Sequence, residues 1–424
     1  MRKTRVQSLP SNPKPPAIVI GLDNMTGLQT ARILARHQVP VIAIANDPAH
    51  FCCRTKVCEK ILFASTKNEE FIRLLEEMGP TLGAKAVLFP CSDLSVLQIS
   101  RNRERLEPWY HVALPDPEVV ETLVDKLRFI HFAWERNLPI PKTLFIKNRS
   151  EAVKAARELA FPVIMKPPMK TPTWESNTKA KVFKPSSAQE FMDLYDQCSD
   201  WADELMVQEF IEGPDANLYS CNCYYDAASQ PLVSFIARKL RQWPPETGTS
   251  CLGEEVRNDI VLEESLRLFT SVGYHGLGYV EMKLDQRTGK HYIIEPNIGR
   301  PTGRSAIAEA GGVELVYTMY CDKLGLPLPA NRQQKYEGVK WIYLRHDIQS
   351  ALHYWRRGEL TLRDWWKSWQ GRKGYAIFSW SDPAPFWHDI GRTLVRAFGE
   401  LKNRSRGRRS AAPELKTYRK KELL

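Results

Sequence analysis

Apolar residues in the first hundred positions follow two alternating patterns. Short runs in which every residue is apolar are typical of strands buried on both faces of a parallel sheet. Stretches with apolar residues every three or four positions, such as Leu28, Ala31 and Leu34, predict helices. The alternation predicts an open βαβ sheet with right-handed crossovers. The predicted elements are a strand at 17–20, a helix within 21–38, a strand at 39–45, a helix over 68–78 and a strand at 86–90.

This first predicted domain, 16–115, is Rossmann-like, but its first turn does not match a dinucleotide site. Gly21 and Gly27 stand six positions apart, so the GxGxxG fingerprint is absent. Asp23 lies between them, and its carboxylate would repel a pyrophosphate at the N-terminus of the following helix. NAD binding is therefore not expected.

The second predicted domain, 116–330, begins after Pro115-Asp116-Pro117 and mixes helices with alternating strands. Its residues 140–207 are expected to form a lid subdomain. The class expected for the whole chain is α/β (α+β). The predicted elements are helices over 118–137, 187–197 and 260–272, a strand within 138–146, strands at 161–166 and 205–211, a strand pair within 216–240, and a hairpin over 277–297.

Charge is concentrated at the C-terminal end of the chain. The net charge is +11, and residues 391–424 hold +8 of it, in eleven Lys or Arg against three Glu. A nucleic-acid enzyme spreads basic residues over its working face, so no nucleic-acid partner is expected. The region 331–424 is expected to be a Trp-rich segment with a basic tail, and 1–15 a disordered leader. No apolar run is long enough to cross a bilayer, and the basic N-terminus lacks a signal-peptide pattern, so a cytoplasmic location is expected.

The nine cysteines do not predict a metal or disulfide framework. Their number is odd, their spacing is irregular, and no pair of CxxC motifs exists. Cys221 and Cys223 alternate within an apolar stretch and are expected to be buried strand thiols.

The hairpin at 277–297 carries the most informative polar residues. Its turn centres on 287–289, so Glu281 and Glu295 should face each other at ~5 Å. Asn297 lies two positions beyond Glu295 and points to the same face. Two carboxylates and an amide oxygen are ligands that suit Mg²⁺, with Mn²⁺ also possible. The alternative, left open here, is a solvated face whose acids are balanced by Lys283 and Lys290.

Two lysines and one strand exit add to this pattern. Lys166 closes an apolar strand, and Lys126 follows Asp125 on a helix near the domain boundary. The segment 205–215 runs from an apolar strand into a Gly-Pro turn, where backbone groups could bind a purine. Each feature also has an ordinary structural explanation, but their order along the chain makes coincidence improbable.

Taken in order, the motifs DK, PVIMKP, VQEFIEGPD, VEMK and EPN resemble those of the ATP-grasp superfamily, over roughly 17–330. The layout is similar to D-alanine–D-alanine ligase and biotin carboxylase, and most of all to predicted carboxylate–amine ligases linked with bacterial cell-surface polysaccharide synthesis. The resemblance implies that ATP and Mg²⁺ bind between two antiparallel sheets. The implied roles are phosphate binding by Lys126, Lys166 and Lys239; adenine and ribose binding by Gln208, the backbone of Glu209 and Ile211, and Asp215; metal binding by Glu281, Glu295 and Asn297; and catalysis by Arg300 and Lys239.

The chain also departs from the family pattern. The loop 167–181, which would cover the phosphates, contains no glycine. Arg300 and Arg304 follow Glu295 by five and nine positions, where many relatives carry an arginine after four. Arg300 is the better candidate for steering a carboxylate or a tetrahedral oxyanion, because its planar fork suits both; the alternative is a surface arginine beside a glycine turn. Substrate specificity is expected on 23–26, 92–93 and 299–312.

The expected function is an ATP-dependent ligase that activates a small carboxylate as an acyl phosphate and joins it to an amine, in envelope or cell-surface polysaccharide precursor synthesis. The alternatives are a kinase that binds ATP in the same way and a non-catalytic ATP-binding scaffold. A homodimer is a possible assembly. An apolar stripe with a basic border is expected on a C-terminal helix. The favoured interpretation packs that stripe on 341–369, and the alternative is peripheral contact with the inner face of a membrane. The stripe comprises Phe386, Trp387, Ile390, Leu394, Phe398 and Leu401.

Overall fold

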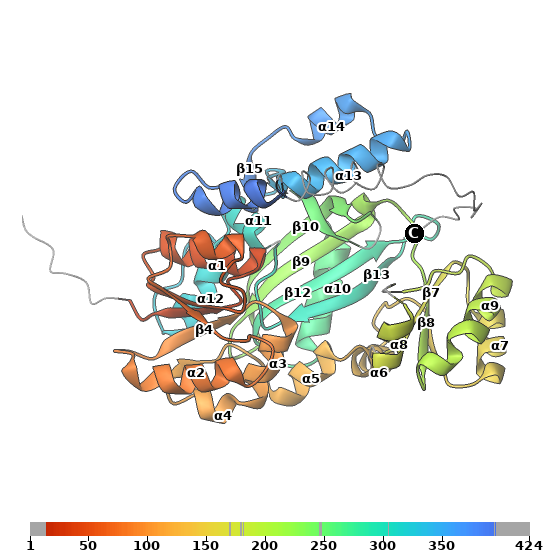
Figure 1. The fold of residues 1–424 in the computed structure, drawn as a ribbon, viewed down its shortest axis with the longest axis horizontal. Helices are drawn as coiled ribbons and strands as arrows, with labels where there is room; N and C mark the ends of the chain where they lie inside the picture. The colour runs from red at the N-terminus through yellow and green to blue at the C-terminus, as the bar shows by residue number, and fades with distance from the viewer. Residues whose placement is uncertain are drawn as a thin grey trace, which may run out of the picture.

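The computed structural model describes residues 14–168, 171–178, 180, 182–245, 248–303, 305–393 and 395. Three sheets organise them, and the predicted α/β (α+β) class with an N-terminal parallel sheet is confirmed. Figure 1 shows the parallel sheet and its helices on the left, a long antiparallel sheet in the centre and a small lid on the right.

The N-terminal sheet is fully parallel, with strand order β3-β2-β1-β4-β5. The expected Rossmann-like pattern is therefore present, but two of its strands were not predicted. β3 lies at the sheet edge with no fully buried residue, and its apolar run Ile61–Phe63 is short; β5 has two residues only. The elements are β1 (Ala17–Ile20), α1 (Met25–Arg36), β2 (Val41–Ala45), η1 (Phe51–Arg54), β3 (Lys60–Phe63), α2 (Glu70–Met78), η2 (Gly79–Thr81), β4 (Ala86–Pro90), α3 (Asp93–Arg101), α4 (Arg103–Leu106) and β5 (Tyr110–His111).

The loop between β1 and α1 is held by its own polar residues. Asn24 caps α1 by accepting a hydrogen bond from the Gly27 N–H at 2.8 Å. A Cβ at Gly27 would lie 2.2 Å from the Gly21 carbonyl oxygen, so only glycine fits there. The Asp23 carboxylate accepts from the backbone N–H groups of Asn46 and Asp47. Asp23 therefore fixes the β2 loop beside the β1 loop.

The connection to the second domain contains two helices where one helix over 118–137 was expected. α5 (Pro117–Val124) ends at Asp125, whose backbone is extended, and α6 (Lys126–Glu135) begins directly afterwards. The Asp125 carboxylate accepts from the Arg128 N–H at 2.9 Å and caps α6. The prediction of a single helix is wrong because the apolar periodicity runs through this break. Lys126 consequently stands at the first position of a helix.

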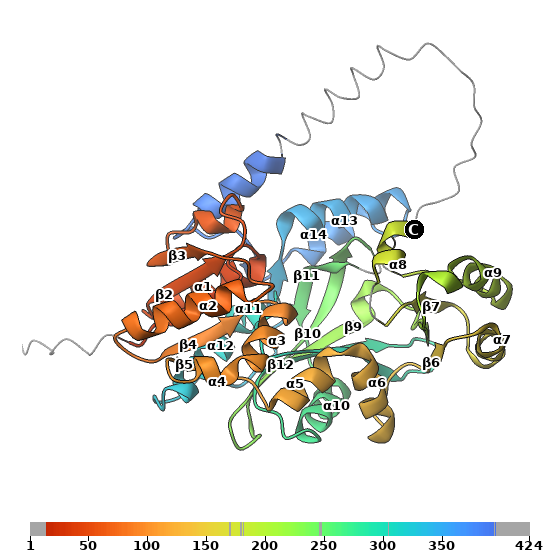
Figure 2. The ribbon, with the colours of Figure 1, turned by 60° about the horizontal axis from the view of Figure 1, so that its bottom comes forward.

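The lid is a three-stranded antiparallel sheet with strand order β6-β8-β7 and its own apolar core. Trp174 and Phe191 are fully buried in that core. Figure 2 shows α7 and α9 on the outer side of the lid. The elements are β6 (Thr143–Ile146), α7 (Arg149–Glu158), β7 (Val163–Lys166), α8 (Pro172–Asn177), α9 (Ala188–Cys198), η3 (Ser199–Trp201) and β8 (Leu205–Glu209).

The large sheet has strand order β13-β12-β9-β10-β11-β14-β15 and is antiparallel except for its last pair. Cys221 and Cys223 lie buried on β9 as free thiols, as expected. The elements are η4 (Asp215–Asn217), β9 (Leu218–Tyr225), β10 (Pro231–Trp243), β11 (Thr249–Glu255), α10 (Asp259–Thr270), β12 (Gly276–Leu284), β13 (His291–Ile298), α11 (Ser305–Ala310), α12 (Leu315–Lys323), β14 (Lys340–Ile342) and β15 (Lys373–Tyr375).

The tryptophan-rich region is part of the fold. α13 (Leu344–Arg356) packs beside β10 and β11, and α14 (Leu362–Ser368) is joined to β10 through the hydrogen bond from Arg241 to the Ser368 hydroxyl. Asp347 on α13 is fully buried and ion-pairs with Arg241 of β10 at 2.7 Å. The indole N–H groups of Trp365 and Trp369 donate to the same carboxylate at 3.0 and 2.7 Å. Figures 1 and 2 both show these helices as a layer above the large sheet.

Candidate active site

Glu281 on β12 and Glu295 on β13 are paired directly across the hairpin, as the turn position predicted. A β-bulge follows, because Met282 pairs with Ile293 and leaves Ile294 as the extra residue. Asn297 pairs with Tyr279, two positions along on each strand. The two carboxylates and the amide therefore share one face of the sheet.

A buried cation lies beside the first of these acids. The Lys239 Nζ on β10 is 3.1 Å from Glu281 Oε1, and the side chain of Lys239 is 5% exposed. The hydroxyl of Tyr279 donates to the other Glu281 oxygen at 3.0 Å. Lys283, one of the two lysines considered as partners of the acids, instead has its ammonium 4.7 Å from the ring centre of Phe210. Lys239, expected to contact phosphate, thus balances Glu281 in the ligand-free chain.

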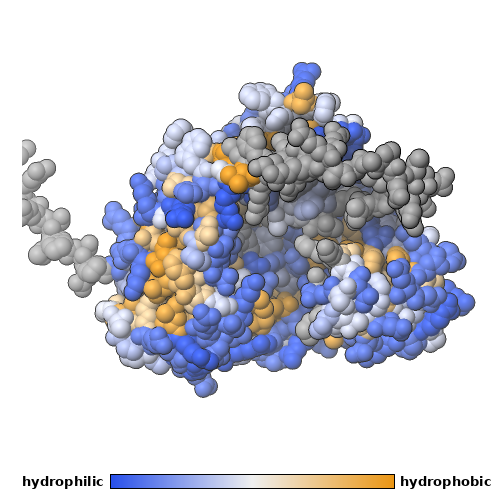
Figure 3. All heavy atoms as spheres, in the orientation of Figure 1, coloured by the Kyte–Doolittle hydropathy of each residue, from blue (hydrophilic) through white to orange (hydrophobic). Residues whose placement is uncertain are grey.

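Glu295, the second acid, lines a cavity of about 170 Å³. The other lining residues come from distant parts of the chain. Most of the lining residues are apolar, and the polar groups come from the lid, the hairpin and the helix N-termini. Figure 3 shows the surface hollowed between the lid on the right and the body of the molecule. The polar and charged residues that line the cavity are Asp93, Lys126, Lys166, Gln208, Glu295 and Asn297.

The two lysines of the cavity lack a counter-ion within the described ranges. Burial and, to a smaller extent, the charge of Lys126 lower the pKa of Lys166, Glu295 opposes them, and the net result is a pKa of about 8. Lys126 also sits at the N-terminus of α6, where the helix dipole adds positive potential. An anion such as a phosphate would relieve this repulsion, so the cavity is suited to bind one.

The exit of β8 has backbone groups suitable for a purine edge. The Glu209 N–H already donates to the Lys142 carbonyl, and the Glu209 carboxylate accepts from the Ala160 N–H. In the part of the chain that the structure covers, the N–H of Ile211 has no hydrogen-bond acceptor. Gln208 donates to the Thr143 hydroxyl at 2.8 Å. Ile211 is therefore the better placed of the two backbone donors expected here.

Asp215 is buried and already accepts three hydrogen bonds. Its donors are the Gln242 N–H at 3.1 Å, the Gln242 side-chain amide at 2.7 Å and the Tyr354 hydroxyl at 2.7 Å. A carboxylate accepts about four, so one acceptor site remains for the expected ribose contact. Gln242 also accepts from Lys239 at 3.3 Å, which continues the chain of polar contacts to Glu281.

Gln242 and Tyr354 were not predicted as part of the site. Strand alternation from Lys239 predicts Gln242, three positions on, to lie on the opposite face, and a bulge between the two residues brings it to this face instead. Tyr354 lies 139 positions from its partner, in the region beyond the family resemblance, and carries no local signal.

Arg300 joins the hairpin to the N-terminal domain. Its Nε is 2.6 Å from Asp93 Oδ1, and its Nη2 donates to Asn297 Oδ1 at 2.5 Å. Asp93 begins α3, which Ser92 caps. The planar fork of Arg300 therefore stands between the candidate metal ligand and the domain expected to select the substrate. Lys179 and Arg304 lie outside the described residues, as do parts of the loop 167–181.

The donor set fits Mg²⁺ better than a softer metal. No group of three His, Cys, Asp or Glu residues suited to hold a metal occurs within the described ranges. Glu281, Glu295 and Asn297 offer two carboxylates and one amide oxygen. Mg²⁺ keeps several of its positions for water and phosphate oxygens, so a small protein donor set suffices.

Sequence comparison gives distant relatives. No known family model matches the chain. It is 24% identical over 247 residues to the D-aspartate ligase of Enterococcus faecium strain Aus0004, covering 56% of this chain and 58% of that protein. It is 20% identical over 187 residues to D-alanine–D-alanine ligase B of Pseudomonas putida KT2440, covering 41% and 54%. The matched region thus spans little more than half the length of these relatives.

Solved structures share more of the architecture. An N5-carboxyaminoimidazole ribonucleotide synthetase bound to ADP aligns with a TM-score of 0.61 and 13% identity, covering 81% of this chain and 86% of that chain. The biotin carboxylase domain of the Hydrogenobacter thermophilus 2-oxoglutarate carboxylase, bound to MgADP, aligns with a TM-score of 0.58 and 15% identity, covering 75% and 72%. At these identities the likeness establishes the fold.

Proposed function

We propose that this chain, which has the ATP-grasp fold, is an ATP-dependent carboxylate–amine ligase that works through an acyl phosphate. The observation that carries the proposal is the meeting of Lys126 and Lys166 with Glu295 and Asn297 in one cavity. The two lysines suit the phosphates of ATP, and the carboxylate with the neighbouring amide suits the Mg²⁺ that accompanies those phosphates. The distant relatives named as ligases support the same reaction class.

Each residue has a role that follows from its place. Lys126 and Lys166 hold the phosphates of ATP, with the Ile211 N–H at the adenine edge and Asp215 at the ribose. Glu281, Glu295 and Asn297 hold Mg²⁺, which, when bound, neutralises charge on the transferred phosphoryl group. Lys239 keeps Glu281 in position and reaches the phosphates when ATP is bound. Arg300 orients the substrate carboxylate and stabilises the oxyanion formed from it.

The reaction consists of two balanced transfers. A carboxylate oxygen attacks the γ-phosphorus of ATP, and ADP leaves with the electron pair of the broken bond. The amine nitrogen then attacks the acyl carbon, loses its proton, and displaces phosphate, which retains the original carboxylate oxygen. The products are an amide, ADP and phosphate.

An isotope experiment tests this reaction. ATP is combined with a panel of ¹⁸O-labelled carboxylates, including D-aspartate and D-alanine, with and without amines. We expect ¹⁸O in the released phosphate, and a hydroxamate when hydroxylamine replaces the amine. A phosphorylated acceptor with no amide indicates a kinase, and tight ATP binding without turnover indicates a scaffold; either result contradicts the proposal.

The cellular setting is a separate part of the proposal. We infer action on envelope or cell-surface polysaccharide precursors, membrane contact through the basic tail 391–424, and location at the inner face of the membrane. None of the helices within the described ranges is long and apolar enough to cross a membrane. A homodimer is the proposed assembly, since the biotin carboxylase domain that aligns with this chain is a dimer. Light scattering of the full chain tests the assembly, and precursor acceptors in the substrate panel test the setting.

A further inference from the structure

The two helices of the tryptophan-rich region expose large apolar side chains in a regular pattern. Ile348, Leu352 and Trp355 are spaced by four and three positions and share one face of α13. Leu362 and Trp366 are spaced by four positions on α14 and are 63% and 67% exposed. We refer to these five residues as the α13–α14 apolar face.

Packing within the molecule does not account for this face, because other residues of the same helices make the internal contacts. On α13, Asp347 ion-pairs with Arg241, and the Tyr354 hydroxyl donates to Asp215. On α14, Trp365 and Trp369 donate to Asp347. An exposed apolar set that the core does not use marks an interaction surface.

Cations border the apolar face. Arg356, Arg363 and Lys367 are exposed, and no ion pair involving them occurs among the described residues. The neighbouring Arg357 is balanced by Glu359 at 2.6 Å. Asp364 is the one exposed acid on the described parts of these helices, so the face combines tryptophan, leucine and isoleucine with a net positive border.

We propose that the α13–α14 apolar face docks on the surface of an anionic lipid bilayer. Tryptophan rings favour the headgroup level, and leucine and isoleucine reach the acyl boundary below it. Arginine and lysine stems extend along apolar surface while their charges contact lipid phosphates. Such contact is peripheral. It rests on the exposure and charge of this surface and stands apart from the proposed ligase reaction.

A second copy of the chain fits this surface less well than a bilayer. A two-fold dimer through this face brings the same patch of both copies together. Arg356, Arg363 and Lys367 of one copy would then meet the same three residues of the other, and Asp364 is the one exposed acid that the described parts of these two helices offer against them. The charge favours an anionic partner.

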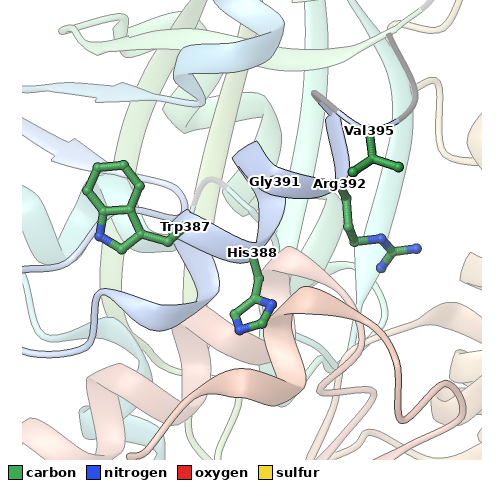
Figure 4. Close-up of a pocket in the computed structure, with 5 residues that line it drawn as sticks. All are labelled: Trp387, His388, Gly391, Arg392 and Val395. Carbon is green, nitrogen blue, oxygen red and sulfur yellow. The ribbon is translucent and has the colours of Figure 1, made fainter. Parts of the chain in front are cut away.

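The C-terminal helix, predicted to carry an apolar stripe, is held against the protein where the structure describes it. Phe386 packs on the main core, and Asp389 ion-pairs with Arg345. Figure 4 shows His388 pointing towards the N-terminal domain, with Trp387 on the other side of the helix. Phe386 thus packs inwards while Trp387 is 62% exposed, so the described part of the stripe does not form one free face. Leu394, Phe398 and Leu401 lie outside the described residues.

The docking surface also adjoins the acid proposed to bind ribose. Tyr354 contacts Asp215 from one side of α13, and the next residue, Trp355, is half exposed on another. Docking through Trp355 would therefore bring the Asp215 side of the molecule towards the bilayer.

Vesicle co-sedimentation of the full-length chain tests the proposal. The vesicles are phosphatidylcholine alone or with phosphatidylglycerol, at low and high salt. One variant carries Leu362→Ser and Trp366→Ser, and a second carries Arg363→Glu and Lys367→Glu. Trp380→Ser is the matched control, since Trp380 is 89% exposed but lies outside both helices. A further variant changes Arg404, Arg406, Arg408 and Arg409 to Gln, which separates the tail from the helices.

We expect binding to the anionic vesicles only, weakened at high salt and at least about tenfold weaker in both α14 variants. The Trp380→Ser variant should bind like the unchanged chain, and the tail variant, which removes four charges of the basic tail, should lose less binding than either α14 variant. Thermal melting of each variant confirms that it is folded. The proposal is overturned if the full-length chain does not bind, if the α14 variants bind normally, or if only the tail variant loses binding. It is also overturned if the α14 variants instead abolish a dimer seen by light scattering.

Discussion

Glu281 and Glu295 face each other across the β12–β13 hairpin, and their environments differ. Glu281 is held by the ammonium of Lys239 and the hydroxyl of Tyr279. Glu295 lines the cavity opposite Lys126 and Lys166. One acid is thus balanced within the sheet, and the other is directed to the space where we place the phosphates. Because of this asymmetry, we expect substitution of Glu295 to affect the catalytic rate most directly.

Glu295→Gln should abolish turnover and leave the fold intact. The amide keeps the shape but removes the charge that balances the metal, so the rate should fall at least about 100-fold. Steady-state ADP release measures the change. Glu263→Gln on the exposed face of α10 is the control and should retain activity. A variant that keeps more than about a tenth of the rate contradicts the metal assignment.

Lys126→Ala and Lys166→Ala should each weaken nucleotide binding. Both side chains line the cavity and neither has a described counter-ion, so the phosphates gain from both charges. Titration calorimetry with a non-hydrolysable ATP analogue measures the loss, which we expect to reach about tenfold or more for each. Lys179→Ala should matter less, because Lys179 falls in the loop that does not match the family pattern. Equal losses in all three variants contradict this ranking.

The hairpin acids could be predicted from the sequence because their placement is local. The turn position and strand alternation were sufficient to pair Glu281 with Glu295, even with a bulge in between. The order of motifs likewise indicated that Lys126 and Lys166 would converge, as they do.

Two kinds of feature were missed. The start of α6 at Lys126 depends on a local cap, Asp125, but the apolar periodicity runs through it and hides the break. Other features depend on distant packing. Tyr354 reaches Asp215 from a helix 139 positions away, and its placement depends on the buried pair of Asp347 and Arg241. Non-local contacts of this kind leave no periodic pattern in the sequence from which they could be predicted.

Lys166→Met should stabilise the ligand-free protein while removing its affinity for ATP. The folded state lowers the pKa of Lys166 from 10.5 to about 8, so between these values the unfolded chain binds more protons and stability rises with pH. The decrease in unfolding free energy caused by the charged Lys166 is therefore fully present below about pH 8 and disappears towards pH 10.5. Thermal midpoints should favour the Met variant at neutral pH, with a difference that shrinks as pH rises. Lys154→Met on α7 serves as an exposed control. If the difference in thermal midpoint between the Met variant and the unchanged chain does not change with pH, the prediction is wrong.

Arg300→Lys should impair use of the carboxylate more than use of ATP. The guanidinium spans Asp93 and Asn297 at once, and a single ammonium cannot reproduce that fork. We expect kcat/KM for the carboxylate to fall at least about tenfold, with KM for ATP nearly unchanged. Arg287→Lys in the hairpin turn is the control, since Arg287 is half exposed and bonds only Asp285 among described residues. An equal rise of both KM values indicates a general structural role instead.

Asp382→Asn should loosen the C-terminal segment from the N-terminal domain. The Asp382 side chain is 1% exposed and accepts from Arg32, the Thr55 hydroxyl and the Lys56 N–H. Arg32 also donates to the backbone carbonyls of Ile377 and Asp382. Removing the carboxylate leaves the buried charge of Arg32 without a counter-ion, which costs about 3–5 kcal/mol of unfolding free energy.

Urea unfolding followed by tryptophan fluorescence measures this loss, and limited proteolysis reports whether residues 376–393 are released first. Asp196→Asn is the matched control, because Asp196 forms an exposed ion pair with Arg149 within the lid and should change little. ATP binding should persist in the Asp382 variant under native conditions, since neither Asp382 nor Arg32 lines the candidate active site. An unchanged unfolding midpoint would show that the backbone contacts of Arg32 alone hold the segment. Loss of ATP binding in a folded variant would instead show that the C-terminal segment reaches the site through α13, by way of Tyr354 and Asp215.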